Sequence, residues 1–428
     1  MACHDVAEGS PAVTGVFKAL LKIQKIRQTG MLYLAMVASI IVSVGVSAVN
    51  TRLLGVSEYG DYRFILNLFS MAMTISSLGF FVTGGRMIAL EDDPVKKRQL
   101  MGAQGVTVAL LGFVLIAIFF FLADYQERWL GNDLGAVIKL VLPLVFTYPL
   151  RLCLENLLKG DNRIASLSLI RAMPGILYLM VIIPLSAYKD IGLFDALVVF
   201  MVTKVLVEVL AYFRLQPSLA DARKWLIRLV EGTKEYGFPV YLGMIAGTAT
   251  TQMAGVTLAY FLDNIAVGYF MLALTITMPL TMISSVVGTV FFKDFAKQPK
   301  LPGKVIVVTL LVTSATYIVF AMAIKPLILV IYTKEFLPVA DIAYIVGIGA
   351  LVLGLSEIVN NFVCAHGGGV MARNAAFARG VVNMFGYTVL VSVIGVYGAA
   401  VTTVLSAVAH LSVITYYYNQ ITKTSRAY

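Results

Sequence analysis

Charged residues are scarce in this chain. Only 13% of its 428 residues are Asp, Glu, Lys or Arg, whereas 59% are hydrophobic. A soluble domain carries about 25% charged residues. A water-soluble fold could not cover so much apolar surface with so little charge, so we expect lipid to surround most of the chain.

Cysteine and histidine are also rare, with three of each. The cysteines (Cys3, Cys153 and Cys364) show no spacing typical of a disulfide framework or a metal site. Cys364 and His366 alone would supply only two ligands on a glycine-rich loop. No nucleophile stands beside a base. We therefore predict no catalytic residues, no metal and no cofactor.

Long apolar runs recur along the whole chain, each near the roughly 20 residues that a membrane-spanning helix needs. The alternating segments of about ten residues that mark a β-barrel are not seen. The sequence predicts an all-α polytopic membrane protein. Its twelve predicted spans are 31–50, 63–85, 100–123, 134–157, 167–187, 192–213, 238–262, 265–291, 305–332, 338–363, 375–396 and 398–418.

The net charge of +10 does not indicate nucleic-acid binding, because its distribution follows the predicted spans. Most Lys and Arg fall in the two tails and in the loops after even-numbered spans. Cytoplasmic loops carry such an excess. The pattern predicts that both termini are cytoplasmic.

The chain resembles one unit used twice. At a constant offset Leu54 matches Leu262 and Gly60 matches Gly268, and "ISS" occurs at 75–77 and again at 283–285. Parallel repeats of this kind are related by an axis along the membrane normal in some transporters. We predict a cytoplasmic tail with an amphipathic helix (1–30), a six-helix lobe (31–213), an amphipathic cytoplasmic linker (214–237), a second six-helix lobe (238–418) and a short tail (419–428).

Several cations are candidates for binding an anion. The second span ends on Gly84, Gly85 and Arg86, and Lys293 stands one position from the counterpart of Arg86. A pair at the cytoplasmic rim would suit a diphosphate, although both residues could also be topology anchors. The predicted substrate-binding residues are Arg86, Lys293, Lys204, Arg63, Arg151 and Lys139.

Charges inside predicted spans each require a reason, since insertion costs about 2.5–3.5 kcal/mol. Lys204 and Glu208 lie four residues apart on one helical face and either pair structurally or line a water-filled cavity. Arg151 and Glu155 have the same spacing. The candidates for binding a coupling ion or a proton are Glu208, Glu357 and Asp263.

One segment resembles a known family. Arg52, Leu54, Gly55, Tyr59, Gly60 and Tyr62 form a short turn that is similar to one in the polysaccharide transporters. These are the Wzx-type flippases of the multidrug/oligosaccharidyl-lipid/polysaccharide superfamily. Tyr332 and Phe336 match a second motif, although Thr333 replaces its usual glycine.

The resemblance implies a specific function. The substrate would be an oligosaccharide on polyprenyl diphosphate, such as an O-antigen unit of lipopolysaccharide, flipped across the bacterial inner membrane by alternating access. The family pattern favours Arg86, Lys204 and Lys293 as residues of a central cationic cavity. Transport would be coupled to an ion gradient, proton or sodium. Membrane lipid and other polysaccharide assembly proteins would be its partners.

Three other classes remain open. A multidrug or cation antiporter of the same superfamily would favour an acidic, aromatic cavity. A membrane enzyme of glycan assembly usually carries a large outer loop with catalytic residues, whereas the outer loops predicted here are short. A non-transporting assembly factor would leave the charges inside the spans without a function.

Overall fold

The computed structural model describes residues 11–424 apart from 131–133, 292–294 and 297. All the regular elements in these ranges are helical. The first half of the fold contains α1 (Pro11–Ser76), α2 (Phe80–Leu90), α3 (Pro94–Leu130), α4 (Gly135–Val141), η1 (Leu142–Leu144), α5 (Thr147–Gly160), α6 (Ile164–Ser186) and α7 (Leu193–Arg214).

The first half is connected to the second by α8 (Ala222–Gly232) and the π-helical turn η2 (Thr233–Gly237). This connection lies within the predicted linker 214–237. The second half contains α9 (Phe238–Met244), η3 (Ile245–Ala249), α10 (Thr250–Phe261), α11 (Asn264–Val290), α13 (Gly303–Ile331), η4 (Lys334–Phe336), α14 (Pro338–Ala365), α15 (Gly369–Ile394) and α16 (Val396–Thr424).

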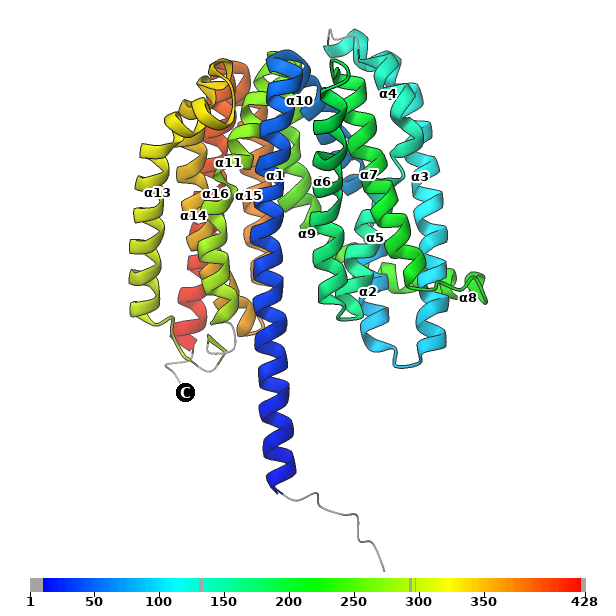
Figure 1. Cartoon of the computed structure of the whole chain (residues 1–428). Helices are drawn as coiled ribbons and strands as arrows, with labels where there is room; N and C mark the ends of the chain where they lie inside the picture. The colour runs from blue at the N-terminus through cyan, green and yellow to red at the C-terminus, as the bar shows by residue number, and fades with distance from the viewer. Residues whose placement is uncertain (1–10, 131–133, 292–294, 297, 425–428) are drawn as a thin grey trace, which may run out of the picture.

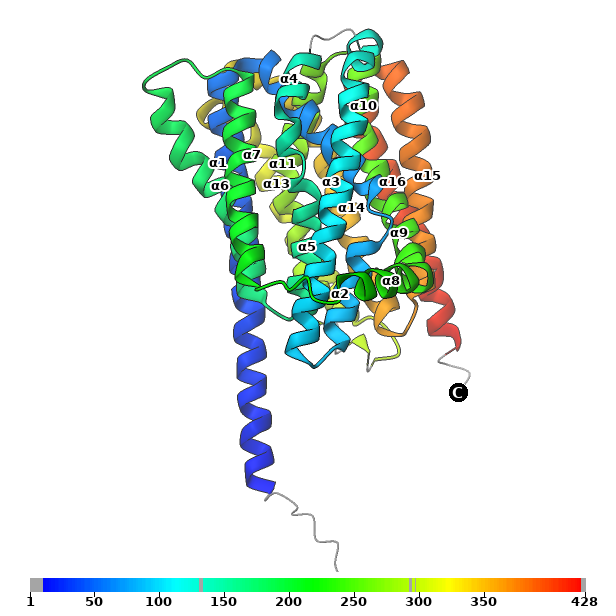
Figure 2. The ribbon, with the colours of Figure 1, turned by 90° about the vertical axis from the view of Figure 1, so that its right-hand side faces the viewer.

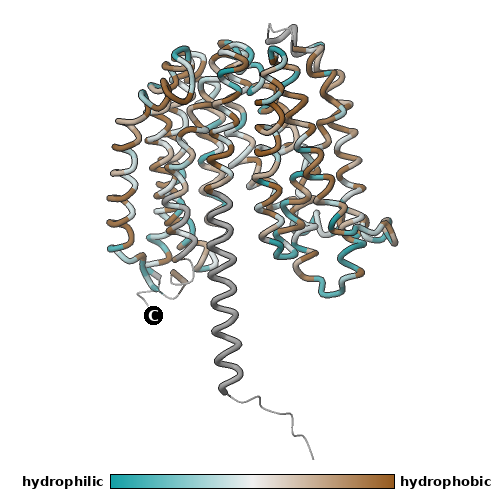
Figure 3. The backbone as a smooth tube through the Cα atoms, viewed as in Figure 1, coloured by the Kyte–Doolittle hydropathy of each residue, from teal (hydrophilic) through white to brown (hydrophobic). Residues whose placement is uncertain are grey.

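The long helices run side by side and form an elongated bundle (Figures 1 and 2). Hydrophobic residues cover the length of the bundle, and hydrophilic ones gather toward its two ends (Figure 3). Helix α8 lies across one end (Figure 2). A bundle with an apolar girdle between two polar ends is what a bilayer requires, since a helix satisfies its own backbone hydrogen bonds in hydrocarbon.

Helix α1 contains two helices joined at Gly55, whose φ of 65° and ψ of −171° interrupt the helical backbone. Glycine adopts a positive φ without the steric cost that a Cβ brings. The chain reverses at the top of Figure 1 and returns toward α2. The predicted span 31–50 therefore precedes the kink, and the predicted span 63–85 occupies the returning part and the start of α2.

The count of twelve spans is not confirmed. Nine helices of the described residues are long and apolar enough to cross a membrane, or ten if the pair Gly135–Leu144 and Thr147–Gly160, bent by 41°, is one span. The difference between the twelve predicted spans and these counts arises where one continuous or divided helix replaces predicted spans. Both arms of α1 belong to one 40-residue stretch, Val37–Ser76, and the predicted span 238–262 is divided by the π-helical turn η3 into α9 and α10.

The two halves meet along α1, which packs against α6 of its own half and against α10 and α11 of the other. The second half is held together mainly by α11, α14, α15 and α16. Between the halves, Asn67 of α1 donates to the Gln252 carbonyl at 2.9 Å. The arm before Gly55 also takes part, since Arg52 Nε donates to the Ile331 carbonyl at 3.0 Å, so both arms of α1 contact the second half.

A cationic cavity as the candidate functional site

A cavity of about 310 Å³ opens between α1, α5, α6 and α7. Four cations line it, and among the described residues that line it there is no carboxylate. Its remaining polar lining consists of hydroxyl groups and one amide. The cavity is therefore a cationic chamber within membrane-spanning helices. The four cations are Arg63, Arg151, Arg171 and Lys204.

Local sequence explains how these side chains reach the chamber. Helices α4 and α5 are separated by η1 with Pro143, which redirects the chain so that α5 presents Arg151. Proline lies inside α6 at Pro174. The neighbouring Gly175 lets α1 approach, because a Cβ there would come within 2.5 Å of the Val42 side chain.

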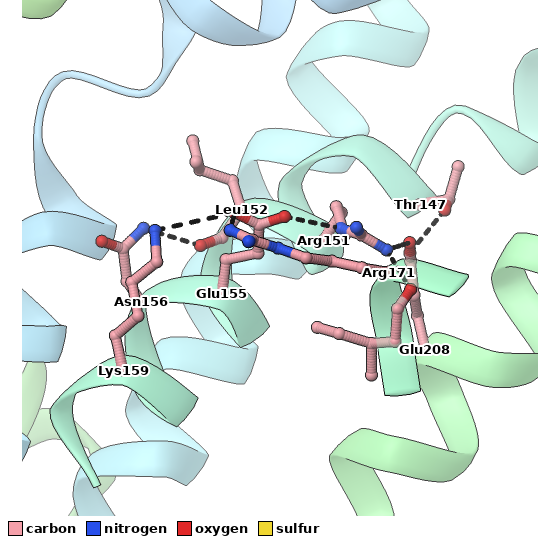
Figure 4. Close-up of polar contacts among 9 residues, drawn as sticks. Thr147, Arg151, Leu152, Glu155, Asn156, Lys159, Arg171 and Glu208 are labelled. Carbon is pink, nitrogen blue, oxygen red and sulfur yellow. Dashed lines mark hydrogen bonds and ion pairs between the residues drawn. The ribbon is translucent and has the colours of Figure 1, made fainter. Parts of the chain in front are cut away.

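Carboxylates behind the chamber orient two of the arginines (Figure 4). Arg151 Nε lies 3.0 Å from Glu155 Oε1, and its Nη1 lies 3.6 Å from Glu208 Oε1. Arg171 Nη2 lies 3.3 Å from the other oxygen of Glu155. Guanidinium groups fixed in this way keep donors available for a planar, bidentate contact with an anion.

Glu208 has no exposed surface. Thr147 Oγ1 donates to its Oε2 at 2.5 Å, and its Oε1 has no hydrogen-bond donor among the described residues. The sequence left open a pairing of Glu208 with Lys204 on the same helix. In the structure the ion pair of Glu208 is made instead with Arg151 of α5.

Lys204 makes no ion pair with any described residue. Its ammonium lies 4.3 Å from the centroid of the Tyr148 ring and 5.7 Å from that of Phe200. Aromatic faces attract a cation without neutralising it. The ammonium of Lys204 therefore faces aromatic rings, with no carboxylate of the described residues within ion-pair distance.

Arg63 connects the chamber to the second half. Its Nη2 lies 3.3 Å from the Met271 carbonyl oxygen and 3.4 Å from Thr275 Oγ1, both on α11. An anion that drew this guanidinium into the chamber would weaken a contact between the halves.

The chamber thus contains three of the predicted substrate-binding residues and one that was missed, Arg171. The sequence could have indicated Arg171, because it is a charged residue within the predicted span 167–187. Arg86 lies elsewhere, exposed on α2, with its guanidinium carbon 4.2 Å from the centroid of the Tyr236 ring. Lys139 is also outside the chamber and pairs with Asp124 at 2.5 Å. Lys293 lies outside the described residues.

The other two predicted ion-binding carboxylates lie in the second half. Asp263 Oδ1 accepts from the Ala266 N–H at 2.7 Å and caps the start of α11. Glu357 of α14 has Asn360 Nδ2 at 3.4 Å. The described residues contain no group of three or more His, Cys, Asp and Glu that could hold a metal ion.

Comparison with solved structures shows the fold. The lipid II flippase MurJ in an inward closed conformation is 14% identical with a TM-score of 0.73, over 92% of this chain and 90% of that one. An inward-facing multidrug MATE transporter of the MOP superfamily is 12% identical with a TM-score of 0.71, over 91% and 95%. A Vibrio cholerae MATE transporter is 14% identical with a TM-score of 0.59, over 93% and 97%.

No curated protein sequence matches the chain. A family model described as polysaccharide biosynthesis protein matches residues 26–293, more than half of the chain. These solved structures are a lipid II flippase and multidrug transporters. The chain therefore belongs to the polysaccharide biosynthesis protein family, carries several helices able to span a membrane among its described residues, and shares the fold of these solved flippases and transporters.

Proposed function

We propose that the chain flips an oligosaccharide on polyprenyl diphosphate, an O-antigen or related surface polysaccharide unit, from the cytoplasmic to the outer leaflet. The observation that carries this proposal is the chamber with four cations and, among its described residues, no carboxylate. A diphosphate is the charged part of such a lipid. Arginine contacts phosphate oxygens in pairs, and lysine adds a compact charge.

The chamber suits an alternating-access cycle. Arg151 and Arg171 are held by carboxylates from behind, whereas Arg63 contacts α11 of the other half. A diphosphate that recruits Arg63 exchanges this contact between the halves for a contact with the substrate. Binding energy would then favour rearrangement of the halves, because a ligand shifts an equilibrium only through its differential affinity for the two states.

Orientation, location and energy source are part of the same proposal. The two lobes 31–213 and 238–418 would rock about the linker 214–237 in a bacterial inner membrane, with both termini in the cytoplasm. An ion gradient would drive the cycle, with Glu208, Glu357 and Asp263 as the carboxylates to test.

A multidrug or cation antiporter is the second candidate, because MATE transporters share the fold. The charge of the chamber disfavours it. Two like unit charges 4 Å apart repel by about 4 kcal/mol near a protein surface. Four cations would therefore weaken the binding of an organic cation and strengthen that of a diphosphate.

The test is translocation in proteoliposomes that carry a polyprenyl-diphosphate oligosaccharide on one leaflet. Arg171→Gln and Lys204→Gln should each slow translocation roughly tenfold, since a charged hydrogen bond contributes about 1.5–3 kcal/mol. Lys139→Gln removes the same charge outside the chamber and should change the rate less than about twofold.

Two results would count against the flippase. The first is a rate that is the same in the chamber variants and the Lys139→Gln control. The second is a wild-type protein that moves an organic dye cation but no diphosphate-linked glycan, which would favour the antiporter.

A further inference from the structure

A second cavity, of about 390 Å³, lies at the end of the first half where α3 begins and where α5 and α7 end. The proposed transport cycle does not use it. It is lined by four cations and two carboxylates, so positive charge is in excess. The charged residues are Lys97, Arg98, Arg163, Arg214, Asp92 and Asp161.

The carboxylate of Asp161 is shared by two of these cations. Lys97 Nζ lies 3.0 Å from its Oδ1, and Arg163 Nε lies 2.6 Å from its Oδ2. Arg98 and Arg214 make no ion pair with any described residue, and both side chains are exposed. Two arginines from different helices thus line one cavity with their charge unneutralised.

Hydrogen bonds to backbone carbonyls connect the walls of this cavity. Tyr212 Oη donates to the Met101 carbonyl at 2.9 Å, which ties the end of α7 to the start of α3. The Ser218 N–H donates to the Arg98 carbonyl at 2.8 Å. Gly102 permits this approach, because a Cβ there would come within 2.0 Å of the Ser218 carbonyl oxygen. The backbone that carries Arg98 is therefore tied to residues on both sides of Arg214.

An apolar stripe leads along α7 to the cavity. Val202, Leu206, Leu210 and Phe213 recur at helical spacing and are between 45% and 66% exposed. On a membrane-spanning helix such side chains face hydrocarbon. The stripe ends at Arg214, the last residue of α7.

The character of helix α8 indicates that this end of the bundle lies at a membrane surface. It lies across the ends of the long helices (Figure 2), with Trp225 buried and bonded through Nε1 to Gln99 at 3.0 Å. Ile227 and Val230 are exposed. A helix with apolar side chains outward in this position is typical of the headgroup region of a bilayer.

We propose that this cavity binds the phosphate of an anionic glycerophospholipid, with Arg98 and Arg214 on the phosphate and an acyl chain along the α7 stripe. Basic pockets between membrane helices on the cytoplasmic side are known to bind anionic headgroups. A free phosphate ion would satisfy the arginines but would leave the stripe unused. The site is separate from the cationic chamber and does not depend on which substrate is transported.

The experiment measures lipids retained by the purified full chain in native mass spectrometry. Phosphatidylglycerol and phosphatidylcholine with the same acyl chains are added separately. Arg98→Gln with Arg214→Gln should weaken phosphatidylglycerol retention roughly fivefold for each charge removed. Lys300→Gln with Lys304→Gln removes two exposed cations near the start of α13 and should leave phosphatidylglycerol retention unchanged.

Arg98→Lys with Arg214→Lys keeps the charge and should retain most of the binding, which separates loss of the site from loss of folding. Equal retention of the two lipids, or equal loss in the glutamine pair and the Lys300/Lys304 control, would overturn the proposal. Displacement of phosphatidylglycerol by inorganic phosphate would assign the site to a soluble ion instead. Retention is measured without any glycan, so a failure of the flippase proposal would leave this result unaffected.

Discussion

Gly60 of α1 and Gly268 of α11 lie against each other where the two halves of the fold meet. A Cβ on Gly268 would come within 3.0 Å of the Gly60 Cα, and a Cβ on Gly60 would come within 2.1 Å of the Asn264 carbonyl oxygen. Both neighbours are backbone atoms, which cannot move aside as a flexible side chain can. The two glycines therefore set the distance between α1 and α11.

Gly60→Ala should force these helices apart. Overpacking of this kind costs about 1–3 kcal/mol, and we expect a lower midpoint of thermal unfolding and slower translocation. Gly247→Ala is the matched control, because nothing lies within 4 Å of a Cβ at that position. A Gly60→Ala protein as stable as the Gly247→Ala protein would show that α1 and α11 have room for a Cβ at their contact.

This contact was accessible from the sequence through the repeat. Gly60 and Gly268 correspond in the two halves, and the constant offset that aligns them also pairs Arg63 with Met271, which form a hydrogen bond in the structure. Equivalent residues meet in this way when they lie near the axis that relates two repeats. The apolar runs likewise predicted an all-helical membrane fold, but not the number of spans. The reversal at Gly55 and the π-helical turn η3 change backbone direction or pitch without interrupting the apolar pattern.

The site was less accessible than the fold. Periodicity identifies a charged residue within a span, but it does not show which spans are neighbours. Glu208 illustrates the limit, since the sequence left a pairing with Lys204 open and the ion pair is made with Arg151 on another helix. Arg86 shows the same limit. The sequence placed it at the end of a span, whereas it lies inside α2 with its guanidinium over the Tyr236 ring and away from the chamber.

Glu208→Gln tests the anchoring of the chamber. The amide oxygen can still accept from Thr147, but the attraction to Arg151 is lost. Because Arg151 keeps Glu155 as a partner, we expect a loss of about 1–3 kcal/mol in unfolding free energy, seen as a lower thermal midpoint in detergent. Glu58→Gln, at an exposed position on α1, is the control and should be neutral. Equal midpoints for the two variants would contradict this role of Glu208.

Arg86→Ala tests whether the rim arginine belongs to the substrate path. Its contact with Tyr236 is exposed, and such cation–π pairs contribute about 0.5–1 kcal/mol. Because Arg86 does not line the chamber, we expect translocation to change little, whereas Lys204→Gln should slow it roughly tenfold. Both variants are assayed in the same proteoliposomes, normalised to inserted protein. Equal, strong losses would place Arg86 on the substrate path and extend the site beyond the chamber.

Glu357→Gln tests ion coupling in the second half. Glu357 has one weak hydrogen-bond donor, Asn360, and the guanidinium of Arg379 on α15 is near enough to attract its carboxylate electrostatically. A carboxylate in a membrane helix with so few partners can exchange a proton without dismantling the helix packing. We expect the variant to lose the acceleration that an imposed proton gradient gives to wild-type translocation, while translocation without a gradient persists.

Asp263→Ala is the comparison variant for Glu357→Gln, because Asp263 is exposed and caps the start of α11. Loss of a cap costs about 0.5–2 kcal/mol, so this variant should be less stable but should keep its response to the gradient. Initial rates with and without the imposed gradient give one ratio for each protein. A ratio that stays high in Glu357→Gln and collapses in Asp263→Ala would assign coupling to the turn between α10 and α11. A ratio unchanged in both variants would leave Glu208 as the remaining candidate for ion coupling.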